Sequence, residues 1–145
     1  MAAAPSVGAV RSALDSTVLV DVLHGDFAAR ASVTQAVAEG VALACGAVYA
    51  ELVSGERAPE VVRAILHQLG VELDPSTDLA LWTLAGERHA QYLSRRRAAK
   101  VPDDRRLLLA DFIIGAHAVV RADCLVTADA GIYATYFPDL TLRRY

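Results

Sequence analysis

Four acidic residues that are far apart in the sequence each stand beside an apolar segment. Asp15 follows a short apolar lead, and Glu51 and Asp129 come shortly after apolar stretches. Asp111 lies at the start of another such stretch. Apolar segments draw their neighbours toward the interior of a fold, so these four carboxylates could gather at one place. Carboxylates held a few ångströms apart repel one another, and a bound divalent cation would relieve that repulsion.

The ligand atoms at these four positions are all oxygens, which indicates the kind of metal. Oxygen-only sets suit Mg²⁺ or Mn²⁺, whereas Zn²⁺ favours His and Cys side chains, which are absent from these positions. Mg²⁺ keeps several waters and prefers substrates that contribute phosphate oxygens. The chemistry that this set indicates is therefore hydrolysis of a phosphodiester by a metal-activated water.

Each acid taken singly also has a structural interpretation. Asp15 and Asp111 could cap helices, and Asp129 could belong to a turn. Glu51 could lie on the solvated surface of a helix. The metal hypothesis therefore depends on the elements that would bring these side chains together.

Strands that alternate with helices would place three of the acids at one edge of a sheet. A strand is expected just before Asp15, a second over residues 41–48 and a third over residues 124–127, each followed by a helix. This order is typical of a three-layer α/β/α domain with a mainly parallel central sheet. Ligands of such sheets bind beyond the carboxyl ends of the strands, where Asp15, Glu51 and Asp129 would lie.

Apolar periodicity predicts the helices that cover this sheet. Gly25 should end the first of them, which begins after Asp15, and the periodicity of the longest helix places Trp82 in the core. Further helices are expected over residues 27–39, 61–69, 79–97, 107–122 and 132–136, with another beginning at 49–52 and short strands over 71–73 and 140–142.

The length and composition favour one soluble domain. The chain has 145 residues, of which 54% are hydrophobic, too many for a disordered protein. We expect residues 1–13 to form a flexible extension and residues 14–145 to form a single domain. No stretch resembles a signal peptide or a membrane span, and Cys45 and Cys124 have no ligand-like spacing, so a cytoplasmic protein with reduced thiols is expected.

Attraction of a polyanion would have to be local, because the formal net charge is −3. A basic run offers such attraction, either as a solvated helix end or as a contact to an RNA backbone. His89 and His117 are interpreted as packed or surface residues rather than general bases, since a metal hydroxide already provides the nucleophile. The basic run consists of Arg95, Arg96, Arg97, Lys100, Arg105 and Arg106.

Four stretches of the chain resemble the acidic motifs of PIN domains, in the order in which that family has them. They are LDSTVLVD at 14–21, VYAEL at 48–52, ADFIIGAHA at 110–118 and LVTAD at 125–129. The closing IYATYFPDL resembles the end of VapC toxins. The resemblance implies a metal-dependent endoribonuclease, the toxin of a type II toxin–antitoxin pair, in which Mg²⁺ or Mn²⁺ is held by Asp15, Glu51, Asp111 and Asp129.

The same resemblance implies an RNA substrate, a homodimer and a VapB-type antitoxin whose C-terminal segment lies across the active groove. Ser16 and Thr127 match hydroxyl positions beside the first and fourth acids, where a hydroxyl could orient a carboxylate or a water. Asp21 matches a frequent acid of the first motif, and we expect a structural role because a spacing of six does not share the helix face of Asp15. Ala128 stands where many relatives have Arg, which puts one phosphate contact in doubt.

Two other functions fit part of this pattern. A haloacid-dehalogenase-like phosphatase also has an Asp after its first strand, but that family has a second Asp two residues later, where this chain has Thr17. A PIN-like domain could instead be a non-catalytic RNA-binding or regulatory subunit. The presence of all four acids argues against the second alternative, and metal affinity without turnover of RNA would favour it.

Overall fold

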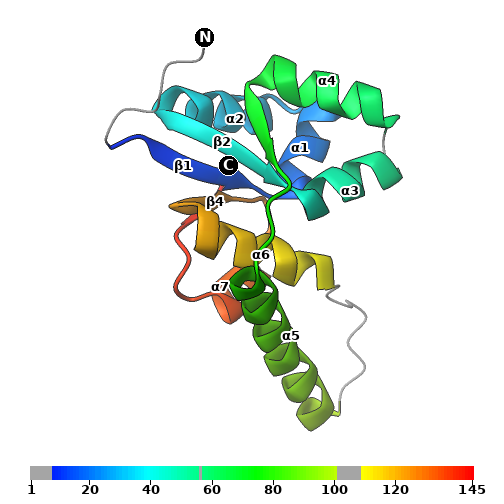
Figure 1. The fold of residues 1–145 in the computed structure, drawn as a ribbon, viewed down its shortest axis with the longest axis vertical. Coiled ribbons are helices and arrows are strands. Elements are labelled where there is room, and N and C mark those ends of the chain that lie inside the picture. The colour runs from blue at the N-terminus through cyan, green and yellow to red at the C-terminus, as the bar shows by residue number, and fades with distance from the viewer. Residues whose placement is uncertain (1–7, 56, 101–108) are drawn as a thin grey trace.

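A parallel sheet forms the centre of the molecule in this computed structural model, which describes residues 8–55, 57–100 and 109–145 (Figure 1). The strand order in the described residues is β3-β2-β1-β4-β5, and every neighbouring pair is parallel. This confirms the expected α/β class. The strands are β1 Val10–Leu14, β2 Gly40–Cys45, β3 Val71–Asp74, β4 Cys124–Val126 and β5 Leu142–Arg143.

The helices of the first half of the chain cover one face of this sheet, and those of the second half cover the other. In Figure 1, α1 to α4 lie on one side of the sheet and α5 to α7 on the other, which makes the three layers. No helix in the described ranges is long and apolar enough to cross a membrane. The helices are α1 Ser16–Leu23, α2 Phe27–Glu39, α3 Gly46–Gly55, α4 Pro59–Leu69, α5 Leu79–Ala99, α6 Leu109–Arg121 and α7 Ala130–Tyr136.

Local capping explains why several helices begin and end where the sequence predicts. Asp26 caps α2 by accepting a hydrogen bond from the amide of Ala29 at 2.8 Å, and α2 has the predicted bounds. Pro59 stands in the first turn of α4, where its missing N–H costs nothing. Gly70 ends α4 with φ of 76°, a left-handed conformation that glycine adopts without strain.

The predicted strand over residues 41–48 is wrong in its second half. Strand β2 ends at Cys45, which is paired with Asp74, and α3 begins at Gly46. Val48 is buried on helix α3. It would also have been buried on the predicted strand. A short apolar run does not distinguish a buried strand from a buried helix, so the sequence placed this boundary too late.

The domain begins earlier than the sequence indicated. Residues 10–13, assigned to the flexible extension, lie in β1 and pair with β2. Arg11 and Ser12 interrupt the apolar pattern there, although Ser12 is fully buried and accepts a hydrogen bond from the Cys124 thiol at 3.3 Å. The rest of the extension, residues 1–7, lies outside the described residues. The final strand also differs, since β5 starts at Leu142 rather than at residue 140.

The second helical layer buries a different face of α5 from the one expected. Trp82 is 47% exposed, so its predicted place in the core is wrong. The buried residues of α5 are Leu81, Ala85 and Tyr92. The buried face therefore includes Leu81, one position before Trp82. The Tyr92 ring packs against Phe112 of α6, with 5.7 Å between ring centroids, and aromatic contacts of this kind set the buried face.

Gly115 lets the closing segment approach α6. A Cβ at this position would lie 2.4 Å from Cε2 of Phe137, a distance that real Cβ atoms essentially never show. Phe137 directly follows α7 and is fully buried. The space beside Gly115 on this face of α6 therefore accommodates an aromatic ring.

Candidate active site at the carboxyl edge of the sheet

The fold places the acidic residues near the carboxyl ends of the three central strands. Asp15 directly follows β1 and caps α1, while Asp129 follows β4 and caps α7. Glu51 lies on α3, the helix that leaves β2. Asp111 lies in the first turn of α6, which packs on the sheet. The interpretation of Asp15 as a helix cap is thus confirmed. Asp129, which was interpreted as a turn residue, caps α7, whereas Asp111, the other expected cap, lies inside the first turn of α6.

Asp15 is the most enclosed of these acids. It is 4% exposed, and its backbone N–H donates to Val126 of β4 at 3.0 Å. Its Oδ1 accepts the amide of Ser16 at 2.8 Å. Its Oδ2 accepts the hydroxyls of Thr127 at 2.8 Å and Thr17 at 3.2 Å. These bonds fix the carboxylate in one orientation.

Thr127 connects the first acid to the fourth. Its buried hydroxyl donates to Asp15 and accepts the backbone amide of Asp129 at 3.0 Å. The carboxylate of Asp129, which is exposed, accepts the amide of Gly131 at 3.3 Å. The expectation that the hydroxyl at position 127 orients a carboxylate is confirmed. For Ser16 the backbone amide makes the shorter contact, since its hydroxyl lies 3.5 Å from Asp15.

Burial makes the negative charge of Asp15 costly. Desolvation raises the pKa of this carboxyl above its ordinary value, and the hydrogen bonds from Thr127, Ser16, Thr17 and Tyr133 only partly offset the rise. An uncompensated buried carboxylate gains stability when a cation approaches. The electrostatics of Asp15 therefore favour a positive ligand.

Tyr133 is a buried tyrosine on which three of the acids act electrostatically. Burial raises the pKa of its phenol far above the ordinary value, and the charges of Asp15, Asp111 and Glu51 raise it further. These three acids come from different elements, so the fold does bring them within electrostatic range of one side chain. The backbone amide of Asp129 donates to the Thr127 hydroxyl, which in turn donates to the Asp15 carboxylate.

Glu51 has an oxygen that nothing in the described part of the chain satisfies. Its Oε2 is buried and has no hydrogen-bond partner there. A buried acceptor without a partner costs free energy, which a bound ion or its water would recover. The chemistry of the donors therefore fits a hard divalent cation.

The spacing of the same donors is more open than that of a closed metal site. Over residues 8–55, 57–100 and 109–145, no three Asp, Glu, His or Cys side chains lie close enough together to hold a metal ion. The acids therefore lie at one edge of the sheet without forming a closed set of ligands, and binding an ion by several of them would require their side chains to move.

Sequence reasoning missed two residues of this site. Tyr133 stands four residues after Asp129, a spacing that places both on one face of α7. Thr17 stands in the first turn of α1, within reach of the acid that caps it. Both positions could have been found by asking which side chains share a helix turn with a predicted acid.

His117 is a packed residue, as the sequence indicated. It is 1% exposed, and its Nε2 lies 3.0 Å from Oδ2 of Asp74, at the end of β3. Burial lowers the pKa of His117, which the Asp74 carboxylate only partly offsets, so the imidazole is neutral at neutral pH and donates to Asp74. Desolvation raises the pKa of Asp74, but bonds from Ser76 and His117 outweigh it and lower the value to about 2.

Asp21 has the structural role that was expected. It accepts a hydrogen bond from the Tyr145 hydroxyl and so ties α1 to the end of the chain. Cys45 and Cys124 are free and buried, as predicted.

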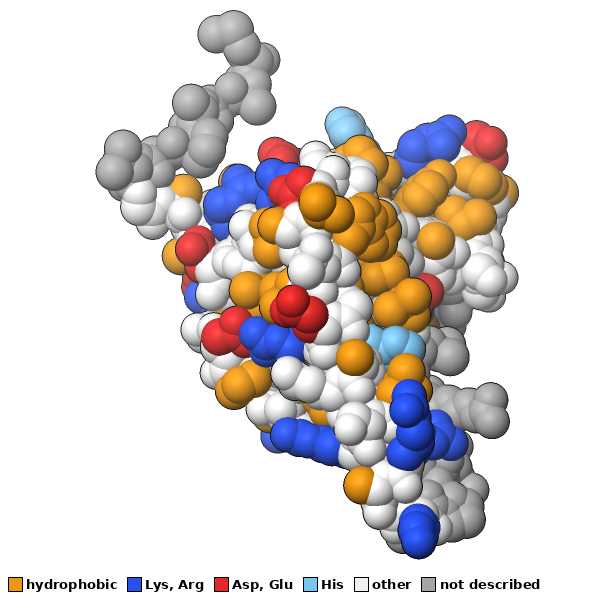
Figure 2. All heavy atoms as spheres, turned by 60° about the horizontal axis from the view of Figure 1, so that its bottom comes forward, with side chains coloured by type: hydrophobic (Ala, Val, Ile, Leu, Met, Phe, Trp, Pro, Cys, Tyr) orange, Lys and Arg blue, Asp and Glu red, His pale blue; other side chains and the backbone are white. Residues whose placement is uncertain are grey.

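The described residues of the basic run lie in the last turns of α5 or directly after it. The Arg95 guanidinium lies 5.2 Å from the centre of the Tyr136 ring, and Arg96 donates to the Tyr92 hydroxyl at 3.0 Å. Figure 2 shows Lys and Arg side chains gathered at its lower end. Arg105 and Arg106 lie outside the described residues.

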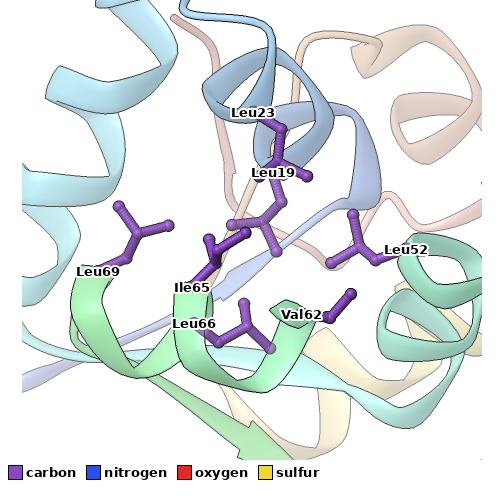
Figure 3. Close-up of a pocket in the computed structure, with 7 residues that line it drawn as sticks. All are labelled: Leu19, Leu23, Leu52, Val62, Ile65, Leu66 and Leu69. Carbon is purple, nitrogen blue, oxygen red and sulfur yellow. The ribbon is translucent and has the colours of Figure 1, made fainter. Parts of the chain in front are cut away.

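An apolar pocket lies on the other side of the sheet from α5. It opens between α1, α3 and α4, and aliphatic side chains alone line it, so it cannot hold an ion (Figure 3). One of them, Leu52, directly follows Glu51 in α3. The lining residues are Leu19, Leu23, Leu52, Val62, Ile65, Leu66 and Leu69.

Comparison with known proteins connects this geometry to a family. The PIN domain family model matches residues 13–138 of the chain. No curated protein sequence matches it.

Solved structures of toxin–antitoxin complexes share the fold. VapBC2 from Rickettsia felis, bound to a DNA fragment from its promoter, has a chain that matches with a TM-score of 0.67 and 16% identity, covering 93% of this chain and 98% of that one. VapBC-1 from nontypeable Haemophilus influenzae matches with a TM-score of 0.65 and 17% identity, covering 92% and 97%. DNA-bound VapBC from Salmonella typhimurium matches with a TM-score of 0.65 and 18% identity, covering 93% and 98%.

Proposed function

This chain belongs to the PIN domain family, and we propose that it is a metal-dependent endoribonuclease, the toxin of a type II toxin–antitoxin pair. The observation that carries the proposal is the position of Asp15, Glu51, Asp111 and Asp129 near the carboxyl ends of the three central strands. Two features there favour a cation, namely the raised pKa of Asp15 and the unpartnered Oε2 of Glu51. The full-length match to chains of VapBC complexes supports the toxin assignment.

The residues of the site divide into ligands and positioning groups. Asp15, Glu51, Asp111 and Asp129 would hold Mg²⁺ or Mn²⁺, which when bound supplies charge to the phosphate and lowers the pKa of a water. Thr127 fixes the orientation of Asp15 and the start of α7 together. The Ser16 amide and the Thr17 hydroxyl donate further hydrogen bonds to the Asp15 carboxylate.

Cleavage assays test this proposal. The purified chain should cut single-stranded RNA in the presence of Mg²⁺ or Mn²⁺ and stop when a chelator is added. Asp111→Asn should abolish cleavage, whereas Glu72→Gln, which neutralises an exposed acid of β3, should leave it intact. Full cleavage by Asp111→Asn would contradict the proposed site.

A non-catalytic PIN-like RNA-binding or regulatory subunit is the second candidate. The open spacing of the acids among the described residues is the observation that favours it. Under that function the chain would bind the metal and RNA without cutting any RNA offered. Turnover that depends on Asp111 would exclude it.

We further propose a VapB-type antitoxin, a homodimer and a reducing, cytoplasmic location. The similar structures support the antitoxin, since each of them is a VapBC complex. Two large apolar side chains near the start of α5, Leu79 and Trp82, are 80% and 47% exposed and are available to an interface. The two buried free cysteines support the location. Light scattering on the purified chain, with Trp82→Glu as the variant, tests the dimer.

A further inference from the structure

Two arginines of α5 lie over aromatic rings, and they differ in what else they contact. The Arg88 guanidinium lies 5.3 Å from the centre of the Phe137 ring. It also donates to the Tyr136 carbonyl at 2.7 Å and to the Asp139 carboxylate at 3.0 and 3.2 Å, so its donors hold parts of the fold together. The Arg95 guanidinium lies 5.2 Å from the centre of the Tyr136 ring, but within the described ranges it makes no hydrogen bond or ion pair. Its donors are therefore available to a ligand.

The contact with Tyr136 leaves one face of the Arg95 guanidinium open. A guanidinium is planar, and each of its two faces can stack on a flat ring. Tyr136, which is 9% exposed, covers one face, whereas Arg95 is itself an exposed residue. The contact also holds the side chain in place, so less conformational freedom is lost when a ligand binds. Arg95 therefore presents a flat, positively charged surface to the solvent.

This flat surface lies near the acidic edge of the sheet. Tyr136 is the last residue of α7, the helix that Asp129 caps, so at 1.5 Å per residue the two are about 10 Å apart along the helix. The Tyr136 ring also packs against Phe112, which follows Asp111 in α6, with 5.6 Å between ring centroids. An RNA strand with a phosphate at the acids therefore has its next nucleotides within reach of Arg95.

We propose that Arg95 is a nucleobase-stacking residue, which receives an unpaired base of the RNA on the open face of its guanidinium. This inference rests on the proposed function, and it names single-stranded RNA as the substrate class, because the bases of a duplex are already stacked on one another. Unstacked bases of single strands and loops do stack on guanidinium planes. Since every base has such a face, Arg95 contributes affinity without sequence preference.

The experiment measures RNA binding by fluorescence anisotropy with a chelator present, in an Asp111→Asn background that should leave the RNA uncut. One probe is single-stranded oligoadenylate, and the other is a ribose–phosphate oligomer of the same length that carries no bases. Arg95→Lys keeps the positive charge and removes the flat surface. It should lower the affinity for oligoadenylate about tenfold, which is within the range that stacking of one base contributes, and leave the affinity for the abasic oligomer unchanged.

Arg30→Lys is the matched control, because Arg30 is an exposed arginine of α2, on the other side of the sheet, and it should change neither affinity. Equal losses of affinity for both probes in Arg95→Lys would overturn the inference, since Arg95 would then act through its charge or through the fold. An unchanged affinity for oligoadenylate would overturn it as well. If the Asp111→Asn chain binds neither probe, the proposed function itself is contradicted, so the two failures are distinct.

Discussion

At the scale of single residues, capping and catalysis turn out to be compatible interpretations of the same acids. Asp15 and Asp129 both cap helices through their side chains. For Asp15 the sequence offers this role as an alternative to metal binding, whereas for Asp129 it offers a turn. A cap uses only some of the lone pairs of a carboxylate. The N-terminus of a helix also favours a nearby negative charge, so capping helps to keep the acid ionised.

Asp15→Asn should separate the cost of the buried charge from its function. The amide oxygen can still accept from Ser16, and the desolvation that raises the pKa of Asp15 no longer applies to a neutral group. Because the new NH₂ group cannot accept from Thr17 and Thr127, this gain is offset, so unfolding experiments on the metal-free protein should show little net change in stability, while RNA cleavage falls by at least about 100-fold. Asp26→Asn, the same change at the cap of α2, should leave cleavage unchanged. Marked destabilisation by Asp15→Asn would contradict this account of its electrostatics.

Individual acids could be identified from the sequence because strong local patterns flank each of them. The joint electrostatic influence of Asp15, Glu51 and Asp111 on Tyr133 could not be predicted, since these acids lie on segments that are remote in sequence. The exposure of Trp82 was missed for a similar reason. Periodicity shows that α5 has an apolar face, but the partner helix decides which residues it covers.

At the scale of elements, the closing segment and α6 depend on one glycine. Gly115→Ala should destabilise the fold by about 1 to 3 kcal/mol, because the new methyl group would overlap the Phe137 ring. Gly86→Ala is the control, since a Cβ there meets nothing within 4 Å, and it should stabilise the exposed helix α5 by about 0.5 to 1 kcal/mol. Denaturant titration of both variants measures these effects. A Gly115→Ala variant as stable as the wild type would show that Phe137 can move away.

The hydrogen bond between Asp74 at the end of β3 and His117 of α6 predicts a dependence of stability on pH. Because Asp74 has a folded pKa of about 2 against an ordinary value of 3.8, its stabilising contribution is present above 3.8 and is lost as the pH falls toward 2. Asp15, with a raised pKa, contributes in the opposite sense, so the wild type must be compared with Asp74→Asn. The stability difference between the two should shrink over this range in urea unfolding experiments. A difference independent of pH would contradict the assignment.

Element types were more predictable than their boundaries. The five strands and seven helices of the described residues were all indicated by periodicity, and α2 was predicted with its observed bounds. The end of β2 was missed because the apolar run continues into α3 without a polar interruption. The start of β1 was missed because a buried serine hides it.

At the scale of the whole molecule, the acidic site and the basic run lie on the same half of the fold. Phe112, the neighbour of Asp111, packs against Tyr136, on which Arg95 rests. A chain with a net charge of −3 can thus attract a polyanion locally. We therefore predict that an RNA backbone would contact this end of α5.

Neutralising the outer part of this run should weaken RNA binding without changing sequence preference. In an Asp111→Asn background, which should leave the RNA uncut, Arg97→Gln with Lys100→Gln should lower affinity. The slope of log affinity against log salt should fall by about 0.7 for each phosphate that the variant no longer neutralises. The pair Arg30→Gln and Arg144→Gln, which changes net charge equally, is the control. Equal reductions in affinity in both pairs would point to net charge instead of local binding.

The strand order has a consequence for how the protein is made. Strand β1 is the middle of the sheet and leaves the ribosome first, yet it pairs with β4, and Asp15 receives its Thr127 hydrogen bond from a residue 112 positions later. Contacts of such long range form late and slowly. A growing polypeptide therefore cannot complete the surroundings of Asp15 until β4 and Thr127 have also been synthesised.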